Sequence, residues 1–209
     1  PPPRPTPHLS PTTPGVPRAR CALAAVRLLE VLRPTDREVH LTIRPPGRDL
    51  IAYELKVNVD LDNFDPSHLR CSDQAREQRG QLHYYRYNDF MAPMASGSHV
   101  TAGMVVCPCS GTTLSAVAAG AAGNLIQRAA EVHLKERRKL ILVPRETPLS
   151  LAHIDNMRRV TEAGAVVLPA SPGWYYEIKS PNDLGDFVVA RICDQLGVEH
   201  SLCKRWGEK

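Results

Sequence analysis

The chain has few aromatic residues and no long uncharged hydrophobic run. Phe, Trp and Tyr make up 5% of its 209 residues, and alanine-rich stretches favour close-packed helices over an all-β sandwich. No segment approaches the roughly 18 apolar residues that a membrane-spanning helix needs, so no membrane span is expected. Residues 22–32 form the best candidate for a signal peptide, but Arg27 and Glu30 interrupt them. We therefore expect a cytoplasmic protein.

The chain also lacks a large excess of one charge, and its cysteines lack a spacing that would hold a metal. It has 26 basic and 22 acidic residues, without the concentrated basic patch that binds nucleic acid. This slight surplus suits an anionic small molecule or is simply a solvated surface. The six cysteines have no metal-ligand spacing, so no metal site is expected. We expect Cys107 and Cys109 to be reduced thiols, buried at the end of a strand.

The first twenty residues differ in composition from the rest of the chain. Eight of the first seventeen are proline, which has no amide proton and a fixed φ, so neither helix nor strand is expected there. Residues 1–20 are therefore predicted to be a disordered or polyproline-like segment. Residues 21–209 are predicted to form a single domain.

Within this domain the apolar pattern alternates between strands and helices. Residues 22–32 and 48–55 are predicted helices, 38–43 a strand, and 56–88 an irregular excursion. From residue 103 onward the order is regular, with strands at 104–107, 140–144 and 165–169 and helices at 113–122, 124–138, from Thr147 to Gly164, and from Ser180-Pro181 onward. This alternation predicts a doubly wound α/β fold of the Rossmann or flavodoxin type, with a parallel sheet covered by helices on both faces.

Two of the predicted strands end in turns that are rich in polar residues. In doubly wound folds, ligands bind beyond the carboxyl ends of the strands, close to helix N-termini. The hydroxyls and amides of residues 110–113 suit a phosphate or a polar ring edge, although helix capping by Ser110 or Thr112 is the simpler explanation. Arg145 and Glu146 follow the next strand, either as part of a ligand site or as a surface ion pair.

The last predicted helix places an arginine on its apolar side. Leu184, Phe187 and Val188 mark an apolar stripe, and Arg191, seven residues after Leu184, returns to within about 20° of it. A buried arginine needs an anionic partner. The sequence leaves open whether that partner is a structural carboxylate or a bound phosphate.

From about residue 88 to its end the chain carries the motifs of one enzyme family. The motifs are Asn88 to Pro93 (NDFMAP), Ala95 to Ser98 (ASGS), Cys107 to Ser110 (CPCS), Leu134 to Arg138 (LKERR), Leu142 to Ser150 (LVPRETPLS) and Gly164 to Pro169 (GAVVLP). With these motifs the chain closely resembles the UbiX-type flavin prenyltransferases. The match is weaker upstream of residue 88.

The resemblance implies an enzyme that makes a cofactor. Members of the family join a dimethylallyl group, usually from dimethylallyl monophosphate, to N5 and C6 of reduced FMN. The prenylated FMN then serves UbiD-type decarboxylases, including those of ubiquinone biosynthesis. The resemblance also implies that no metal is used and that the protein is a homo-oligomer, such as a dodecamer, in which neighbouring chains complete each site.

The resemblance further implies a role for individual residues. FMN would bind at Ser110, Gly111, Thr112, Thr113 and Arg145. The dimethylallyl phosphate would bind at Tyr175, Arg191, Lys135 and Arg128, in a pocket lined by Phe90, Ala95, Ser96 and Gly97. Glu54 and Glu146 would handle protons as the phosphate leaves and the new ring closes.

Two segments depart from the family pattern. Residues 18–21 (Arg-Ala-Arg-Cys) stand where members have a Gly-Ala-Ser-Gly turn that binds flavin, and Arg44 stands where members have a flavin-contacting serine. The matching site residues favour a flavin prenyltransferase, whereas the missing turn favours an inactive member that serves as a scaffold or assembly subunit. A flavin-dependent cysteine decarboxylase of the same fold is less favoured, because the residues for the prenyl phosphate are present.

Overall fold

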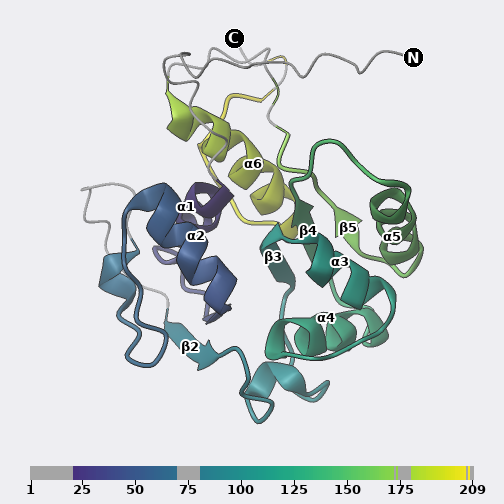
Figure 1. Cartoon of the computed structure of the whole chain (residues 1–209). Helices are drawn as coiled ribbons and strands as arrows, with labels where there is room; N and C mark the ends of the chain where they lie inside the picture. The colour runs from purple at the N-terminus through teal and green to yellow at the C-terminus, as the bar shows by residue number, and fades with distance from the viewer. Residues whose placement is uncertain (1–20, 70–80, 172, 174–179, 206, 208–209) are drawn as a thin grey trace, which may run out of the picture.

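The computed structural model describes residues 21–69, 81–171, 173, 180–205 and 207, and in them strands alternate with helices (Figure 1). The helices are α1 (Cys21–Leu32), α2 (Pro45–Leu55), α3 (Gly111–Ala118), α4 (Leu125–Lys135), α5 (Leu151–Glu162) and α6 (Pro181–Leu196), with short 3-10 helices η1 (Pro66–His68) and η2 (Pro93–Ala95). The strands are β1 (Val39–Ile43), β2 (Leu82–Arg86), β3 (Met104–Cys109), β4 (Leu140–Pro144) and β5 (Val166–Val167). The predicted proline-rich segment 1–20 and Tyr175 lie outside the described residues.

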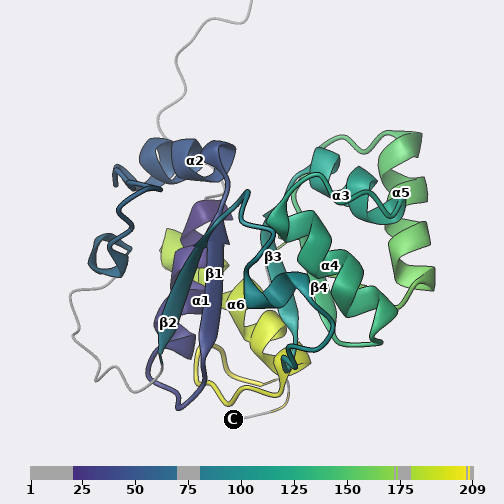
Figure 2. The same cartoon turned by 90° about the horizontal axis from the view of Figure 1, so that it is seen from below.

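The described strands form two parallel sheets. β1 pairs with β2, and β3, β4 and β5 pair in that order. Figure 2 shows the two sheets next to each other, with β1 on the side that faces β3. The register of the second sheet runs from Met104 opposite Leu140 to Cys109 opposite Pro144. The carboxyl ends of β3 and β4 therefore lie next to each other.

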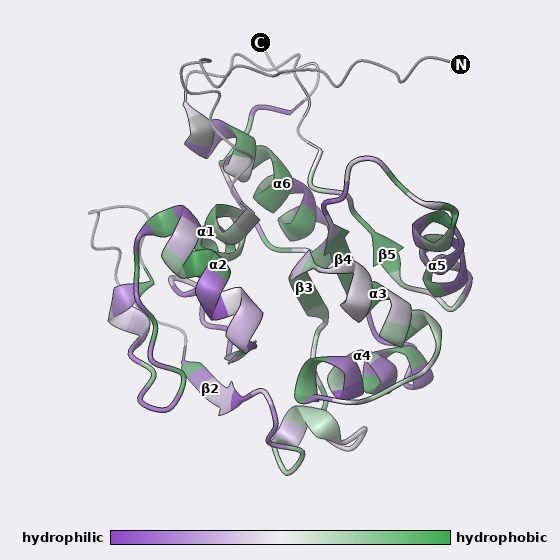
Figure 3. Ribbon diagram, in the orientation of Figure 1, coloured by the Kyte–Doolittle hydropathy of each residue, from purple (hydrophilic) through white to green (hydrophobic). Residues whose placement is uncertain are grey.

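β4 is buried on both of its faces. Leu140 and Leu142 pack against α3, α4 and α5, whereas Ile141 and Val143 pack against α1 and α6. Successive side chains of a strand point to opposite faces, so this apolar run needs a helix layer on each side. Figure 3 shows the hydrophobic strands between the two layers of helices. The predicted α/β fold, with a parallel sheet and helices on both faces, is confirmed.

α1 packs against elements of both sheets. Ala22 and Val26 belong to the apolar cluster that contains Ile43 of β1. Ala24 and Leu28 belong to the cluster that contains β4 and α6. Because the two sheets are not hydrogen-bonded to each other through the described strands, this helix is a main link between them.

Several predicted element boundaries were wrong, among them the start of α2, which lies at Pro45 and not at Arg48, and the extent of β5, which covers only Val166–Val167. α5 begins at Leu151 and not at Thr147, because the Ser150 hydroxyl accepts the amide of His153 and thereby caps the helix. α3 begins at Gly111 because Ser110 caps it in the same way. The segment 56–88, expected to be irregular, contains β2, whose first four residues are all half-buried and so give no alternating signal.

A substitution in β4 tests the importance of this strand. Leu142 is 0% exposed, so Leu142→Ala leaves a cavity and is expected to lower the free energy of unfolding by about 2–5 kcal/mol. Leu151→Ala, the same truncation at a side chain that is 73% exposed, is the control and leaves it nearly unchanged. Chemical denaturation of both variants measures the difference. Equal losses would contradict the assignment of β4 to the core.

Candidate functional site

The turn between β3 and α3 holds the first group of predicted site residues. The Ser110 Oγ accepts a hydrogen bond from the Thr113 amide at 3.3 Å and lies 3.1 Å from the Thr113 hydroxyl. The expected capping role of Ser110 is confirmed. The amides of Gly111 and Thr112 have no acceptor within the helix, as in the first turn of any α-helix. This end of α3 therefore offers amide donors and the positive end of a helix dipole to an anion.

His153 lies against the same turn, and sequence reasoning missed it. A Cβ added at Gly111 would lie 2.9 Å from His153 Nε2, so glycine leaves the space that the imidazole fills. The ring is held from its other side, where Nδ1 accepts the Ser150 amide at 3.2 Å. The Ser-x-x-His spacing indicates a helix start, but it does not reveal that the ring faces the turn after β3.

Arg145 and Glu146 follow β4 and lie beside this turn. The register pairs Cys109 with Pro144, so the residues that follow each of them leave the sheet side by side. Both side chains are exposed, and neither forms an ion pair with another described residue. The surface ion pair left open by the sequence is therefore not observed between them.

Glu54, expected to handle protons, contacts the start of α1. Its Oε2 accepts a hydrogen bond from the Ala22 amide at 2.8 Å. This contact places a carboxylate at the positive end of the α1 dipole, where a negative charge is stabilised. One oxygen of Glu54 is used in this way, and Oε1 accepts no hydrogen bond from the described part of the chain.

A second group of predicted residues gathers along α4. The Arg128 Nε donates to the carbonyl of Ala95 at 3.2 Å, and a Cβ added at Gly97 would lie 2.8 Å from the Lys135 ammonium. Ser96 lies between Ala95 and Gly97 in the sequence. Arg128 also pairs with Glu131 at 2.9 Å, and Lys135 is in contact with the carboxylate of Glu136. α4 thus brings two cations to the small-residue segment 95–97. Phe90, also expected in the prenyl pocket, is 47% exposed just upstream of η2.

Side chains of α4 and of the segment that follows it form hydrogen bonds to residues 97–101. Arg138 donates to the carbonyl of His99 at 2.6 Å and also to the carbonyl of Gly97. The buried His133 contacts the Thr101 hydroxyl through Nε2 at 2.8 Å and the Ala129 carbonyl through Nδ1 at 2.7 Å. These contacts fix the position of the expected prenyl-pocket residues relative to α4.

Arg191 is exposed, contrary to the prediction that it lies on the buried side of α6. Its side chain is 55% exposed, and Nη1 donates to Asp194 Oδ2 at 2.8 Å. The buried face of α6 is centred on Val189, Ile192 and Cys193, to one side of the stripe inferred from the sequence. The sequence left open whether Arg191 pairs with a structural carboxylate or with a bound phosphate. In the described structure it pairs with the carboxylate of Asp194.

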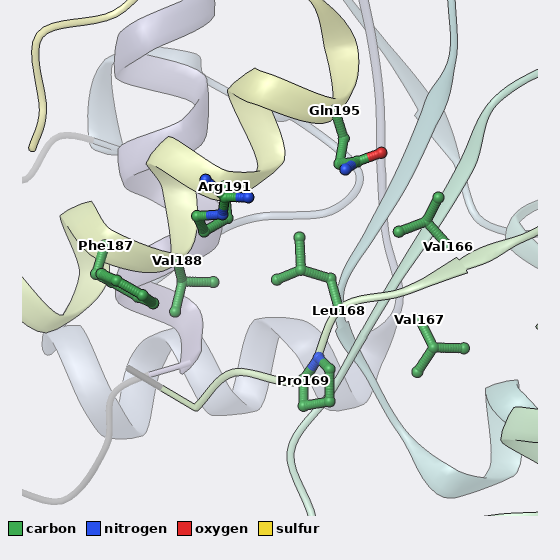
Figure 4. Close-up of a pocket in the computed structure, with 8 residues that line it drawn as sticks. All are labelled: Val166, Val167, Leu168, Pro169, Phe187, Val188, Arg191 and Gln195. Carbon is green, nitrogen blue, oxygen red and sulfur yellow. The ribbon is translucent and has the colours of Figure 1, made fainter. Parts of the chain in front are cut away.

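Arg191 lies at the wall of a groove between β5 and α6. The groove has a volume of about 300 Å³ and is lined by residues 166–169 and by one side of α6 (Figure 4). The side chains that line it are apolar apart from those of Arg191 and Gln195. Such a groove suits an apolar group that lies beside an anion.

Apart from Glu54 at the start of α1 and Tyr175, which lies outside the described residues, the predicted site residues fall into three groups that the described part of the chain does not join. The first lies at the carboxyl ends of β3 and β4, the second along α4, and the third is Arg191 on α6. α4 and α6 cover opposite faces of the sheet. No hydrogen bond or ion pair links the groups within the described ranges.

The described residues contain neither a membrane-spanning helix nor a cluster of metal-ligating side chains. None of their helices is long and apolar enough to cross a membrane. No three of their His, Cys, Asp and Glu side chains are arranged to hold a metal ion. Cys107, Cys109, Cys193 and Cys203 form no disulfide with another of the described residues, and burial raises the pKa of Cys109 to about 12. Cys109 is buried, as expected, whereas Cys107 is only half-buried.

Comparison with known protein sequences places the chain among flavoproteins. A family model described as Flavoprotein matches residues 65–193. The flavin prenyltransferase UbiX of Pseudomonas aeruginosa is 46% identical over 186 residues, which is 88% of this chain and 88% of that protein. The flavin prenyltransferase UbiX of Halalkalibacterium halodurans is 41% identical over 197 residues, which is 94% of this chain and 93% of that protein.

Solved structures agree with these sequence matches. The crystal structure of AnUbiX (PadA1) in complex with FMN and dimethylallyl pyrophosphate has a TM-score of 0.76 and 38% identity, covering 90% of this chain and 92% of that one. A dodecameric FMN-dependent UbiX-like decarboxylase from Escherichia coli O157:H7 has a TM-score of 0.76 and 34% identity, covering 92% and 96%.

The buried His133 predicts a loss of stability in acid. Burial, and secondarily the charge of Arg138, hold its pKa below the ordinary value of 6.5, although the bond to Ala129 opposes this shift. Below about pH 6.5 the unfolded chain binds a proton that the folded chain does not, so the free energy of unfolding falls as the pH falls.

We expect His133→Gln to flatten this decrease when stability is measured by denaturation between about pH 7.5 and 5.5. His68→Gln, at an exposed site on η1, is the control. An unchanged slope in His133→Gln would contradict a neutral, buried imidazole.

Proposed function

Because the chain belongs to the family of UbiX flavin prenyltransferases, we propose that it transfers a dimethylallyl group from dimethylallyl monophosphate to reduced FMN. The prenylated FMN would then pass to a UbiD-type decarboxylase. The observation that carries the proposal is the adjacency of the Ser110 turn and Arg145 at the ends of paired strands, in a chain 46% identical to a flavin prenyltransferase.

FMN fits the first group of residues. The Ser110 hydroxyl, the first-turn amides at Gly111 and Thr112, and the Arg145 guanidinium are hydrogen-bond donors beyond the carboxyl ends of β3 and β4. Donors at a helix N-terminus suit a phosphate or the carbonyl edge of a flavin ring. We assign FMN binding to these residues and to Thr113. FMN supplies the nucleophilic nitrogen and carbon of the reaction.

The second and third groups fit the prenyl donor. When the allylic C–O bond breaks, the phosphate leaves with the bonding electrons and the dimethylallyl group becomes a cation. Arg128 and Lys135 on α4, and Arg191 on α6 with Tyr175, would stabilise the charge that develops on the phosphate. The small residues 95–97 leave space for the prenyl chain, and Phe90 would shelter the cation from water.

Glu146 and Glu54 are assigned the proton transfers. Ring closure adds a proton to the prenyl double bond and replaces the C6–H bond of the flavin by a C–C bond, so one group must donate a proton and a base must take one up. Glu146 is exposed beside the Ser110 turn and has no cationic partner among the described residues. Glu54 keeps Oε1 available while Oε2 holds the Ala22 amide.

We infer that neighbouring chains complete each site. The cations for the donor lie on helices that cover opposite faces of one sheet, so a single chain does not bring them together. In a homo-oligomer, Arg191 of one chain would meet Lys135 of another beside the flavin. A similar UbiX-like protein from Escherichia coli is dodecameric.

An anaerobic incubation tests the proposed activity. Purified protein, reduced FMN and dimethylallyl monophosphate should yield a flavin whose mass is larger by one dimethylallyl unit, with release of phosphate. Glu146→Gln should lose most of this activity, whereas Glu162→Gln, at the exposed end of α5, should keep it. Bound but unmodified FMN would instead support the inactive scaffold.

Arg191→Ala tests the binding of the prenyl donor. Because Arg191 is exposed, the substitution should leave folding intact. Loss of a charged hydrogen bond to phosphate should raise the KM for dimethylallyl monophosphate on the order of 10- to 100-fold at saturating reduced FMN.

Arg158→Ala is the matched control, because it removes an arginine of similar exposure that pairs with Glu162. An unchanged KM for the donor in Arg191→Ala would overturn the assignment of Arg191.

A further inference from the structure

Arg44 is a cationic residue at the carboxyl end of β1. It directly precedes α2, but its side chain makes no capping hydrogen bond to that helix. The first two residues of α2 are Pro45 and Pro46, which have no amide protons to donate. The guanidinium is therefore the hydrogen-bond donor that this strand end offers to a ligand.

The side chain of Arg44 extends to the other sheet. Its Nη2 donates to the Ser110 Oγ at 3.2 Å, which joins the carboxyl ends of β1 and β3 across 66 positions of sequence. The positive charge of Arg44 also favours the thiolate of Cys109, against the larger effect of burial on the pKa of that thiol. The guanidinium thus lies where the N-terminus of α3 already attracts negative charge.

Arg44 lacks a carboxylate partner among the described residues. By contrast, Arg27 pairs with Asp186 at 2.6 Å and Arg48 pairs with Asp49 at 2.7 Å. A guanidinium has five N–H donors, and the contact with Ser110 uses one of them. Within the described part of the chain, the Ser110 hydroxyl is the only hydrogen-bond acceptor of this half-buried guanidinium, so its other donors are in place for an anion.

We propose that Arg44 is a further FMN-binding residue, whose guanidinium binds the phosphate of FMN together with Ser110 and the first-turn amides of α3. The proposal rests on the proposed function, because FMN is the anion that this site would take. The serine that the family resemblance implies at this position is neutral, whereas Arg44 adds a positive charge. The consequence is a stronger dependence of flavin binding on the phosphate group.

The test compares two flavins that differ by the phosphate. The full chain and its Arg44→Ala variant are titrated with oxidised FMN and with riboflavin, following the quenching of flavin fluorescence. We expect Arg44→Ala to weaken FMN binding about 10- to 100-fold, the effect of losing a hydrogen bond to a charged group, and to leave riboflavin binding unchanged. Arg44→Lys should recover part of the FMN affinity.

Arg48→Ala is the matched control, one turn further along on α2, and should leave both affinities unchanged. Equal weakening of FMN and riboflavin would overturn the proposal, because Arg44 would then act by supporting the turn at Ser110. Unchanged FMN binding in Arg44→Ala, or no FMN binding by the unmodified chain, would also overturn it. The titration involves no prenyl donor, so a protein that binds FMN in the expected way without transferring a prenyl group would contradict only the proposed function.

Discussion

The parallel pairing of β3 with β4 is the interaction on which the rest of the structure depends. It aligns Cys109 with Pro144, so the Ser110 turn and Arg145 leave the sheet at neighbouring points. β4 is buried on both faces. α3, α4 and α5 pack against one face, and α1 and α6 pack against the other. The core that stabilises the fold therefore also separates the cations of α4 from Arg191 on α6. One constraint explains both the adjacency of the residues to which we assign FMN binding and the proposal that a neighbouring chain completes the site.

The sequence predicted well those elements whose signal is local. The apolar run at 140–144 identified β4, and the Ser180-Pro181 pair with Asp183 marked the start of α6, where Asp183 accepts the Ser180 amide at 2.7 Å. β2 escaped prediction because an edge strand with half-buried side chains has no clear period. The stripe on α6 was misplaced because two or three apolar residues do not fix the angle of a buried face, and Arg191 falls outside it.

The sequence predicted the site residues that lie in family motifs, but it did not predict the contacts between distant segments. The matching motifs identified the Ser110 turn and Arg145, and the strand register shows why they lie together. The contacts of His153 with the turn and of Arg44 with Ser110 join residues that are far apart in sequence. Such contacts depend on how helices and sheets pack, which single-sequence patterns do not contain. The departure from the family at Arg44 was visible in the sequence, but its meaning required the contact with Ser110.

The central claim is that copies of this chain jointly form a flavin prenyltransferase site, with Lys135 and Arg191 supplied by different chains. The most direct measurement co-expresses Lys135→Ala and Arg191→Ala chains with different tags and purifies the mixed oligomer through both tags. In such an oligomer some sites combine Lys135 of one chain with Arg191 of the other. We expect it to form prenylated FMN while each variant alone is nearly inactive. A mixed oligomer as inactive as its parents would contradict the account.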